Sequence, residues 1–204
     1  MYKLQAPYQP AGDQPKAIQE MTQNYLSGQK EQVLLGVTGS GKTYTMANVV
    51  VNLNKPTLVI AHNKTLAAQL YQEFRDFFPE NAVSYFVSYY DFYQPEAYIV
   101  TTDTYIEKEA QINEEIDKLR LATTANLLSR PDCIVVASVS CIYNLGRPED
   151  FANFALEIVE GEVISRQTLI TRLVDMQYQR VTAELMRGTF RLRGEAVQVW
   201  PANE

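Results

Sequence analysis

The chain has 204 residues, enough for one large domain or for one domain and part of another, with a core that needs no disulfide bonds. Its net charge of −6 argues against a broad basic surface that grips nucleic acid, so any nucleic-acid contact has to be local or assisted. Two cysteines are too few for a disulfide scaffold. No apolar run approaches the roughly 20 residues that span a bilayer, which excludes a membrane protein. The polar start Met1-Tyr2-Lys3-Leu4 is unlike a signal peptide, so we predict a cytoplasmic protein.

An irregular, proline-bracketed stretch at residues 8–15 holds an aromatic ring, Tyr8, and a side-chain amide, Gln14. A ring can stack on a purine, and an amide can both donate to and accept from the edge of a base. The alternative is a loop that caps the next helix through Asp13. Because a nucleotide loop follows shortly, we predict contact with adenine.

A glycine-rich octapeptide, Gly36-Val37-Thr38-Gly39-Ser40-Gly41-Lys42-Thr43, lies between an apolar run at 33–37 and a helix-compatible segment at 44–52. Strand, loop and helix in this order are typical of a phosphate-binding loop, whose N–H groups and helix N-terminus face phosphate oxygens. We expect the lysine at the β- and γ-phosphates and Thr43 at Mg²⁺ bound through ATP. An ordinary glycine-rich turn is the alternative. The predicted ATP-binding residues are Tyr8, Gln14, Gly36, Thr38, Gly39, Ser40, Gly41, Lys42 and Thr43.

Short apolar, β-branched runs at 33–37, 57–61, 83–87 and 134–138 alternate at first with segments of helical spacing. This order predicts an α/β fold with a parallel sheet covered on both faces. Polar residues follow the second run, at the sheet edge where ligands bind in such folds. They are His62, Asn63, Lys64 and Thr65, and they suit a phosphate backbone. Alternatively, Asn63 or Thr65 only caps the helix.

Eight aromatic residues occupy positions 85–105, interrupted by turn formers and acidic residues. Exposed phenol rings can stack on or wedge between bases, each stacked base being worth about 1–3 kcal/mol. No Lys or Arg occurs from residue 76 to 107, so we expect this region to bind a DNA strand only after something else delivers it. A packed aromatic minicore is the alternative.

An acidic pair that holds Mg²⁺ and activates water should follow an apolar strand in a phosphate-loop hydrolase. The strand at 134–138 ends in Ala and Ser instead, and Glu149-Asp150 follows a proline in a loop, where a helix cap is the better interpretation. No arginine finger can be assigned. We therefore expect this chain to bind ATP but not to hydrolyse it efficiently alone.

A second, smaller α+β domain is predicted from about residue 150, incomplete at Glu204. Ser165 can cap a helix, and a compact hairpin follows at 189–200. A two-residue turn would pair Leu192 with Val197 and Phe190 with Val199 on an apolar face. The opposite face then carries Arg191, Arg193 and Gln198.

Five motifs in order along the chain resemble the UvrB family of bacterial excinuclease subunits. They begin at Tyr8, Gly36, Ala61, Tyr89 and Val136, and the tyrosine motif is the most specific of them. The resemblance implies a RecA-like superfamily 2 helicase domain over 1–150 with an inserted β-hairpin at about 89–112, and part of a UvrA-interaction domain over 151–204. It also implies ATP binding and damage verification in nucleotide excision repair with UvrA and UvrC, as part of the SOS response.

The resemblance also implies roles for single residues. Tyr8 and Gln14 would contact adenine, while Glu96 and Arg120 would support the aromatic contacts of the hairpin. The implied DNA-binding residues are His62, Asn63, Lys64, Thr65, Tyr89, Tyr90, Phe92, Tyr93, Glu96, Tyr98 and Arg120, and the implied UvrA-binding residues are Arg180, Arg191 and Arg193. The family's acidic Mg²⁺ motif, second helicase domain and UvrC-contacting region would lie beyond residue 204, so an N-terminal portion is expected.

Two other classes of protein compete with this interpretation. A small-molecule phosphate-loop kinase would need a substrate pocket and a basic lid, and it has no place for the tyrosine-rich stretch. A UvrA-docking module without ATPase activity of its own is the closer alternative.

Overall fold

The computed structural model describes residues 1–94, 97–99, 104–106, 109–142 and 155–203, with the backbone alone described between 90 and 112. The chain divides into two compact units, residues 1–87 with 129–141 and residues 88–128 with 142–204. The predicted boundary near residue 150 lies outside the described residues and stays a prediction. The two units are described separately below.

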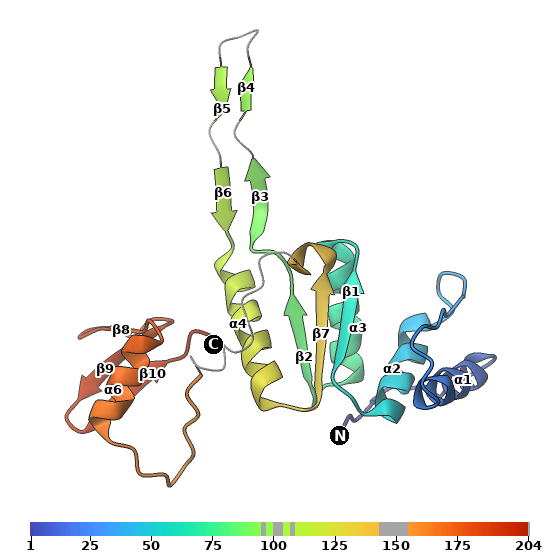
Figure 1. Ribbon diagram of the computed structural model, residues 1–204, viewed down its shortest axis with the longest axis horizontal. Helices are drawn as coiled ribbons and strands as arrows, with labels where there is room; N and C mark the ends of the chain where they lie inside the picture. Colours follow the sequence, from blue (N-terminus) through green and yellow to red (C-terminus); the bar gives the residue numbers. More distant parts are fainter. Residues whose placement is uncertain (95–96, 100–103, 107–108, 143–154, 204) are drawn as a thin grey trace. The chain divides into compact units, whose positions relative to one another are not determined.

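The first unit is built on a three-stranded parallel sheet with the order β1-β7-β2 (Figure 1). Its strands are β1 (Thr57–Ala61), β2 (Ala82–Phe86) and β7 (Cys133–Ser138), each within one residue of a predicted run. Every residue of β7 is buried, as expected for a central parallel strand covered on both faces. A short 3₁₀ turn, η1 (Val139–Ile142), follows it.

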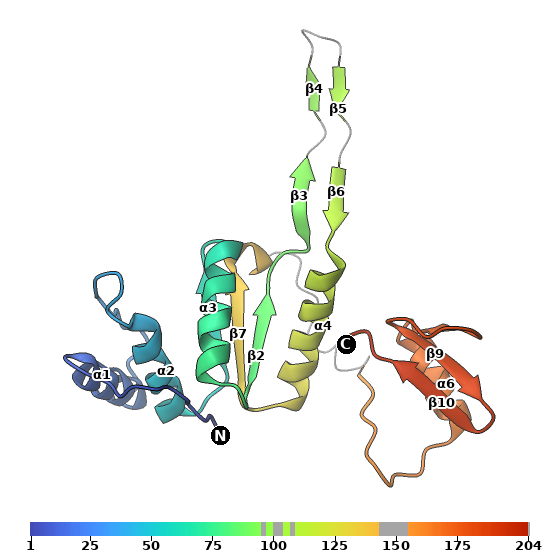
Figure 2. The ribbon, with the colours of Figure 1, turned by 180° about the vertical axis from the view of Figure 1, so that it is seen from behind.

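Three helices belong to this unit: α1 (Gln14–Leu26), α2 (Lys42–Leu53) and α3 (Lys64–Phe77). Helix α3 covers one face of the sheet, lying behind it in Figure 1 and in front of it in Figure 2. Its Ala67 and Phe74 are buried, and its Tyr71 ring lies 5.3 Å from the Tyr85 ring of β2. Helix α2 packs on both α1 and α3.

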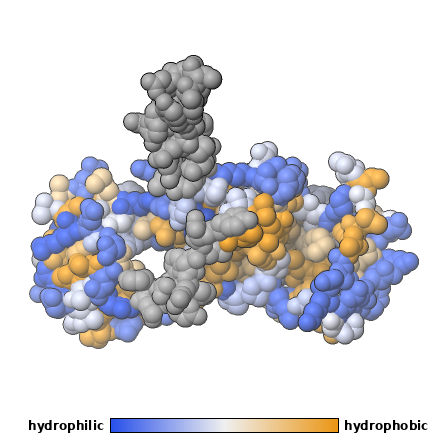
Figure 3. Space-filling view, turned by 45° about the horizontal axis from the view of Figure 1, so that its top comes forward, coloured by the Kyte–Doolittle hydropathy of each residue, from blue (hydrophilic) through white to orange (hydrophobic). Residues whose placement is uncertain are grey.

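The strand predicted before the phosphate loop is not formed. From Val33 to Val37 the backbone is irregular, and the side chains of Val33, Leu35 and Val37 are 84%, 88% and 79% exposed. In the described part of the chain, β1 pairs only with β7, and its Leu58 and Ile60 are also exposed. The prediction was wrong because an apolar β-branched run becomes a strand only where a neighbour takes its backbone groups. Apolar patches are visible between polar ones in Figure 3.

The second unit opens with two antiparallel strand pairs. Strand β3 (Tyr90–Gln94) pairs with β6 (Glu109–Ile112), and β4 (Ala97–Ile99) pairs with β5 (Thr104–Ile106). Helix α4 (Glu114–Ser129) follows β6. Asn113 lies between them, and its Oδ1 accepts from the N–H groups of Glu115 and Ile116, so the helix begins with a capped turn.

The C-terminal part of this unit combines one helix with a three-stranded sheet of order β10-β9-β8. The elements are α6 (Arg166–Asp175), β8 (Gln179–Arg180), β9 (Thr189–Arg193) and β10 (Ala196–Trp200). Ser165 Oγ accepts from the Thr168 N–H at 3.1 Å, so the predicted cap is present. The predicted register is also confirmed, because Leu192 is opposite Val197 and Phe190 opposite Val199.

Candidate functional site

The glycine-rich loop curls as a phosphate-binding loop requires. Gly39 and Gly41 have φ angles of 80° and 74°, a left-handed conformation that glycine adopts without strain. At Gly36 an added Cβ would lie 2.6 Å from Ser40 Oγ, so a side chain there would collide with the loop. The Ser40 N–H donates to the Val37 carbonyl at 3.2 Å and closes the turn.

The N-terminus of α2 opens directly onto this loop. Gly41 is the N-cap, makes no side-chain capping bond, and is followed by a first turn without acidic residues. The first N–H groups of the helix are therefore left for a ligand, and the positive end of the helix dipole is not neutralised locally. Such a terminus attracts anions, phosphates in particular.

Lys42 reaches back across the loop. Its Nζ donates to the carbonyl oxygens of Gly36 at 2.9 Å and of Val37 at 2.8 Å. An ammonium has three donors, so one remains for a further acceptor. The half-buried Thr43 follows on the first turn of the helix. The loop therefore combines N–H groups, a cation and a hydroxyl, a donor set that fits a Mg²⁺-bound triphosphate.

Gln14 joins the upstream segment to the same loop. Its Oε1 accepts from the Ala11 N–H at 3.1 Å, and its Nε2 donates to the Ser40 carbonyl at 3.0 Å. A carboxamide has two acceptor and two donor positions, so one of each remains to read the edge of a base. Asp13 is the N-cap of α1 but makes no side-chain capping bond, so the capping alternative for this segment is not realised.

Tyr8 lies beside this amide on the same segment. The residue is 50% exposed, and its ring packs edge-to-face with the Tyr44 ring at 4.8 Å. An aromatic ring that is supported by a neighbour and still half exposed is suited to stacking on a base. Sequence reasoning placed Tyr8 here but gave no role to Tyr44, whose position in α2 looks like ordinary helix packing.

Polar side chains also gather where β1 and β7 end. Ala61 is opposite Ser138 in the parallel register, so the segment after β1 and the turn after β7 share one sheet edge. Asn63 Oδ1 accepts from the Leu66 N–H at 2.8 Å, so the capping alternative holds for this residue. The remaining predicted residues of that segment are His62, Lys64 and Thr65, and His62 and Thr65 are exposed.

Ser140 is a polar group at this edge that sequence reasoning missed. It is exposed, and its Oγ lies 2.7 Å from the Oγ of the buried Ser138. Cys141 next to it is buried, and its Sγ lies 3.2 Å from the Phe86 carbonyl oxygen. The sequence prediction for the end of this strand concerned only an acidic pair. The hydroxyls themselves were the available signal.

The side chains of Arg120 and Tyr89 form a cation–π contact just before strand β3 begins. The guanidinium of Arg120 lies 4.1 Å from the centre of the Tyr89 ring, and the Arg120 side chain is buried. The Asn113 N–H donates to the Tyr89 carbonyl at 3.3 Å, which ties β3 to the start of α4. The side chains of the other predicted hairpin contacts lie outside the described residues; they are Tyr90, Phe92, Tyr93, Glu96 and Tyr98.

The first two aromatic residues of the 85–105 stretch belong to the sheet. The Tyr85 hydroxyl donates to the Lys64 carbonyl at 3.1 Å, and Phe86 packs on a cluster that includes Cys133 and Val135. For these two residues the packing alternative holds. The rest of the stretch stays a prediction.

The three predicted partner-binding arginines differ in their surroundings. Arg180 and Arg193 are exposed. Arg191 is half-buried, and its guanidinium donates to Gln198 Oε1 and to the Ala183 carbonyl, both at 2.7 Å. Arg191 therefore also fixes the hairpin that carries it.

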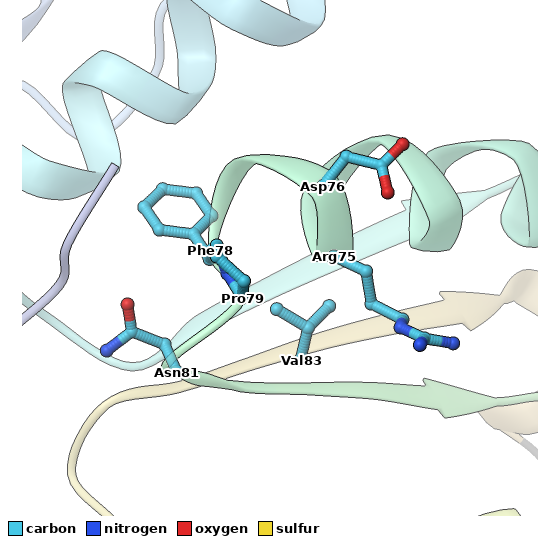
Figure 4. A pocket seen from close by; sticks show the side chains of 6 residues that line it. All are labelled: Arg75, Asp76, Phe78, Pro79, Asn81 and Val83. Atoms are coloured by element: carbon cyan, nitrogen blue, oxygen red, sulfur yellow. The ribbon is translucent and has the colours of Figure 1, made fainter. Parts of the chain in front are cut away.

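A surface pocket of about 440 Å³ lies at the other edge of the sheet, where α3 ends and β2 begins (Figure 4). Arg75 and Asp76 line it together with Phe78, Pro79, Asn81 and Val83. Asp76 accepts from Gln72, and Asn81 is committed to three bonds described next. None of the lining residues belongs to the phosphate loop, and part of the lining consists of polar groups that already have partners.

The polar groups at this edge, where the strands begin (the amino edge of the sheet), form hydrogen bonds with one another. Asn81 accepts from the Lys3 N–H at 2.9 Å and donates to the Met1 carbonyl and to Asp132 Oδ2. Arg130 binds both carboxylate oxygens of Asp132, and this pairing holds the pKa of that carboxyl well below its usual range. Burial raises the pKa of Tyr2 to about 12, and its hydroxyl donates to the Cys133 carbonyl.

Comparison with known families agrees with this geometry. The family model described as type III restriction enzyme, res subunit, matches residues 8–136, more than half of the chain. The chain belongs to this family. For this member of the res-subunit family, a second model, described as UvrB interaction domain, matches residues 156–204.

Curated relatives give the same result over the whole length. UvrABC system protein B from Streptococcus pyogenes serotype M2 (strain MGAS10270) is 59% identical over 202 residues, and that from serotype M5 (strain Manfredo) is 58% identical. Each alignment covers 99% of this chain and 30% of the relative, so the chain spans about a third of their length. The resemblance to UvrB stated from the motifs is confirmed.

The described residues contain no cluster of three or more His, Cys, Asp or Glu side chains arranged to hold a metal ion. They also contain no helix with the length and apolar character needed to cross a lipid bilayer.

Proposed function

We propose that this chain binds ATP with Mg²⁺ and serves, in the cytoplasm, as the nucleotide-binding and DNA-engaging part of a nucleotide excision repair helicase. The observation that carries the proposal is that Gln14 and Lys42 both bind the phosphate loop, at Ser40 and at Gly36. The amide that would contact the base and the cation that would contact the phosphates are thereby held at the same loop. The match to a helicase-type family supports the same conclusion.

In this proposal each group has one task. The N–H groups of residues 36–43 and the α2 terminus bind phosphate oxygens, and Lys42 turns from the loop carbonyls toward the β- and γ-phosphates. Thr43 supplies a hydroxyl to Mg²⁺, which neutralises phosphate charge when bound. Gln14 reads adenine, and Tyr8 stacks on it.

Calorimetric titration with Mg²⁺-ATP tests nucleotide binding. Lys42→Ala should weaken binding by at least about 10-fold, because hydrogen bonds to charged groups are worth roughly 1.5–3 kcal/mol. Lys16→Ala is the matched control, because Lys16 is exposed and pairs with Glu20 on the surface of α1. Equal affinity of wild type and Lys42→Ala would remove the proposal.

The strands β3 to β6 would form the finger that engages damaged DNA, with Tyr90, Phe92, Tyr93 and Tyr98 against the bases and Glu96 in support. The segment His62 to Thr65 would contact the backbone. Because residues 76–107 contain no Lys or Arg, UvrA would deliver the DNA. Tyr93→Ala should lower DNA retention in the presence of UvrA, while Tyr71→Ala, in the α3 packing, should act only through stability.

Arg120 would orient this finger through Tyr89. Tyr89→Phe keeps the ring under the guanidinium, so DNA retention should stay within about 2-fold of wild type. Arg120→Leu removes the cation, and DNA retention should fall further than protein stability alone accounts for. Equal DNA retention by both variants would show that the pair does not orient the finger.

Docking on UvrA is proposed for the hairpin β9–β10, through Arg180, Arg191 and Arg193. The match of residues 156–204 to a UvrB interaction domain supports it. Arg193→Glu should reduce capture by UvrA in a pull-down, whereas Arg166→Glu, at the exposed start of α6, should not. UvrC would contact parts of the relatives that this chain does not span.

A second candidate function is a UvrA-docking module without ATPase activity of its own. It is favoured by the irregular segment from Val33 to Val37, which leaves the phosphate loop without a strand behind it. Retained UvrA capture together with no measurable ATP binding would select this candidate.

A further inference from the structure

Tyr44 stands where the phosphate helix meets the base-binding segment. It follows Lys42 by two residues on α2, but it faces inward and is only 5% exposed. Its hydroxyl donates to the Tyr8 carbonyl at 3.0 Å. Its ring lies between those of Tyr8, at 4.8 Å, and Phe77, at 5.5 Å.

The segment that carries Tyr8 is tied down at three places. Upstream, the Gln5 N–H donates to the Phe77 carbonyl at 2.8 Å, and downstream Gln14 binds the phosphate loop. Tyr44 supplies the bond at Tyr8 itself. Tyr8 is half exposed and its carbonyl is held by Tyr44, so the position of its ring depends on Tyr44.

We infer that Tyr44 is a positioning residue for base recognition, whose hydroxyl fixes the Tyr8 backbone so that the Tyr8 ring meets the adenine of a bound nucleotide. The inference rests on the proposed nucleotide binding and adds a residue to it. Tyr44 lies behind the ring and does not reach the phosphates through its side chain. Affinity for the base should therefore depend on Tyr44, and affinity for the phosphates should not.

Calorimetric titrations with Mg²⁺-ATP and with Mg²⁺-tripolyphosphate separate these two contributions. Tyr44→Phe removes one hydrogen bond and keeps the rings, so ATP should bind about 5-fold more weakly. Binding of tripolyphosphate should stay unchanged. Tyr25→Phe is the matched control, because Tyr25 is 41% exposed and its hydroxyl accepts from Lys55 Nζ at 3.4 Å.

A second variant protects the test against a general loss of structure. Tyr8→Leu should lower the ratio of ATP affinity to tripolyphosphate affinity, and adding Tyr44→Phe to it should lower that ratio no further. If Tyr44→Phe weakens both ligands equally, or neither, the inference is overturned while ATP binding stands. If the wild type binds neither ligand, ATP binding and this inference fall together.

Discussion

Two groups of polar residues in the first unit differ in whether their hydrogen-bonding capacity is used. At the amino edge of the sheet, Asn81, Arg130 and Asp132 bind each other and the start of the chain. At the phosphate loop, the first N–H groups of α2 and the third donor of Lys42 are left open. Paired groups stabilise a fold, whereas open ones are available to a ligand. The first unit thus assigns stability and binding to different residues.

The sharpest way to break this comparison is Asn81→Ala at the amino edge. The change removes three hydrogen bonds, so the free energy of unfolding should fall by about 2–3 kcal/mol. ATP affinity should change far less, because none of the three bonds involves a residue of the phosphate loop. Urea unfolding and ATP titration measure the two quantities, and Asn52→Ala, which removes one exposed bond, is the control.

Gly41→Ala is the corresponding change at the phosphate loop. Its Cβ would lie 2.5 Å from Gln14 Nε2, so the amide must move away from the loop, and we expect ATP to bind about 10-fold more weakly. Gly28→Ala has a similar left-handed backbone at φ 93° with nothing within 4 Å, and should lower stability alone. Equal loss of ATP affinity in both variants would mean that strain, not Gln14, is responsible.

Asn63 is a predicted binding residue whose side chain is already used in the fold, because it caps α3 just after the end of β1. Asn63→Ala should lower the free energy of unfolding by about 1 kcal/mol, and Asn63→Ser, which keeps a capping oxygen, by a few tenths. Thermal unfolding measures both. Any loss of DNA retention that Asn63→Ser shows then belongs to binding, and a large loss of stability in Asn63→Ser would contradict the capping role.

The smallest expected effect is on the pH dependence of stability. The pKa of Asp132 is lowered in the folded state, chiefly by its bond to Arg130, so its contribution is present above the unfolded pKa of about 4 and is lost as pH falls below it. Asp132→Asn should be less stable than wild type by about 0.5–1 kcal/mol at pH 7. The difference should shrink at pH 3. A difference that grows toward acid would contradict the ion pair.

Local patterns were sufficient to predict most of the strands. β1 and β7 follow from short apolar, β-branched runs, and the β9–β10 register follows from a two-residue turn, signals that act over a few positions. The segment before the phosphate loop failed because a strand there needs a partner elsewhere in the chain. Pattern alone does not contain that information.

The candidate site could be predicted from the sequence to about the same extent as the strands. The octapeptide identified its loop, because glycines and Lys42 are needed at fixed spacing. The bond from Gln14 to Ser40 spans 26 residues and follows from the fold. Tyr44 and Arg120 act through neighbouring rings, and contacts of that kind leave no spacing signal in the sequence.

The free side of β1 has a consequence for handling the protein. Among the described residues, β1 has a strand on one side only, and this edge, beside exposed Leu58 and Ile60, is a template onto which another polypeptide can add a strand. Val33 and Leu35 add further exposed apolar surface to the same unit. The net charge of −6 opposes such association at low ionic strength and loses its reach as salt is added. Light scattering of this chain should therefore rise with both protein concentration and salt, and a Lys substituted for Ile60 should suppress the rise.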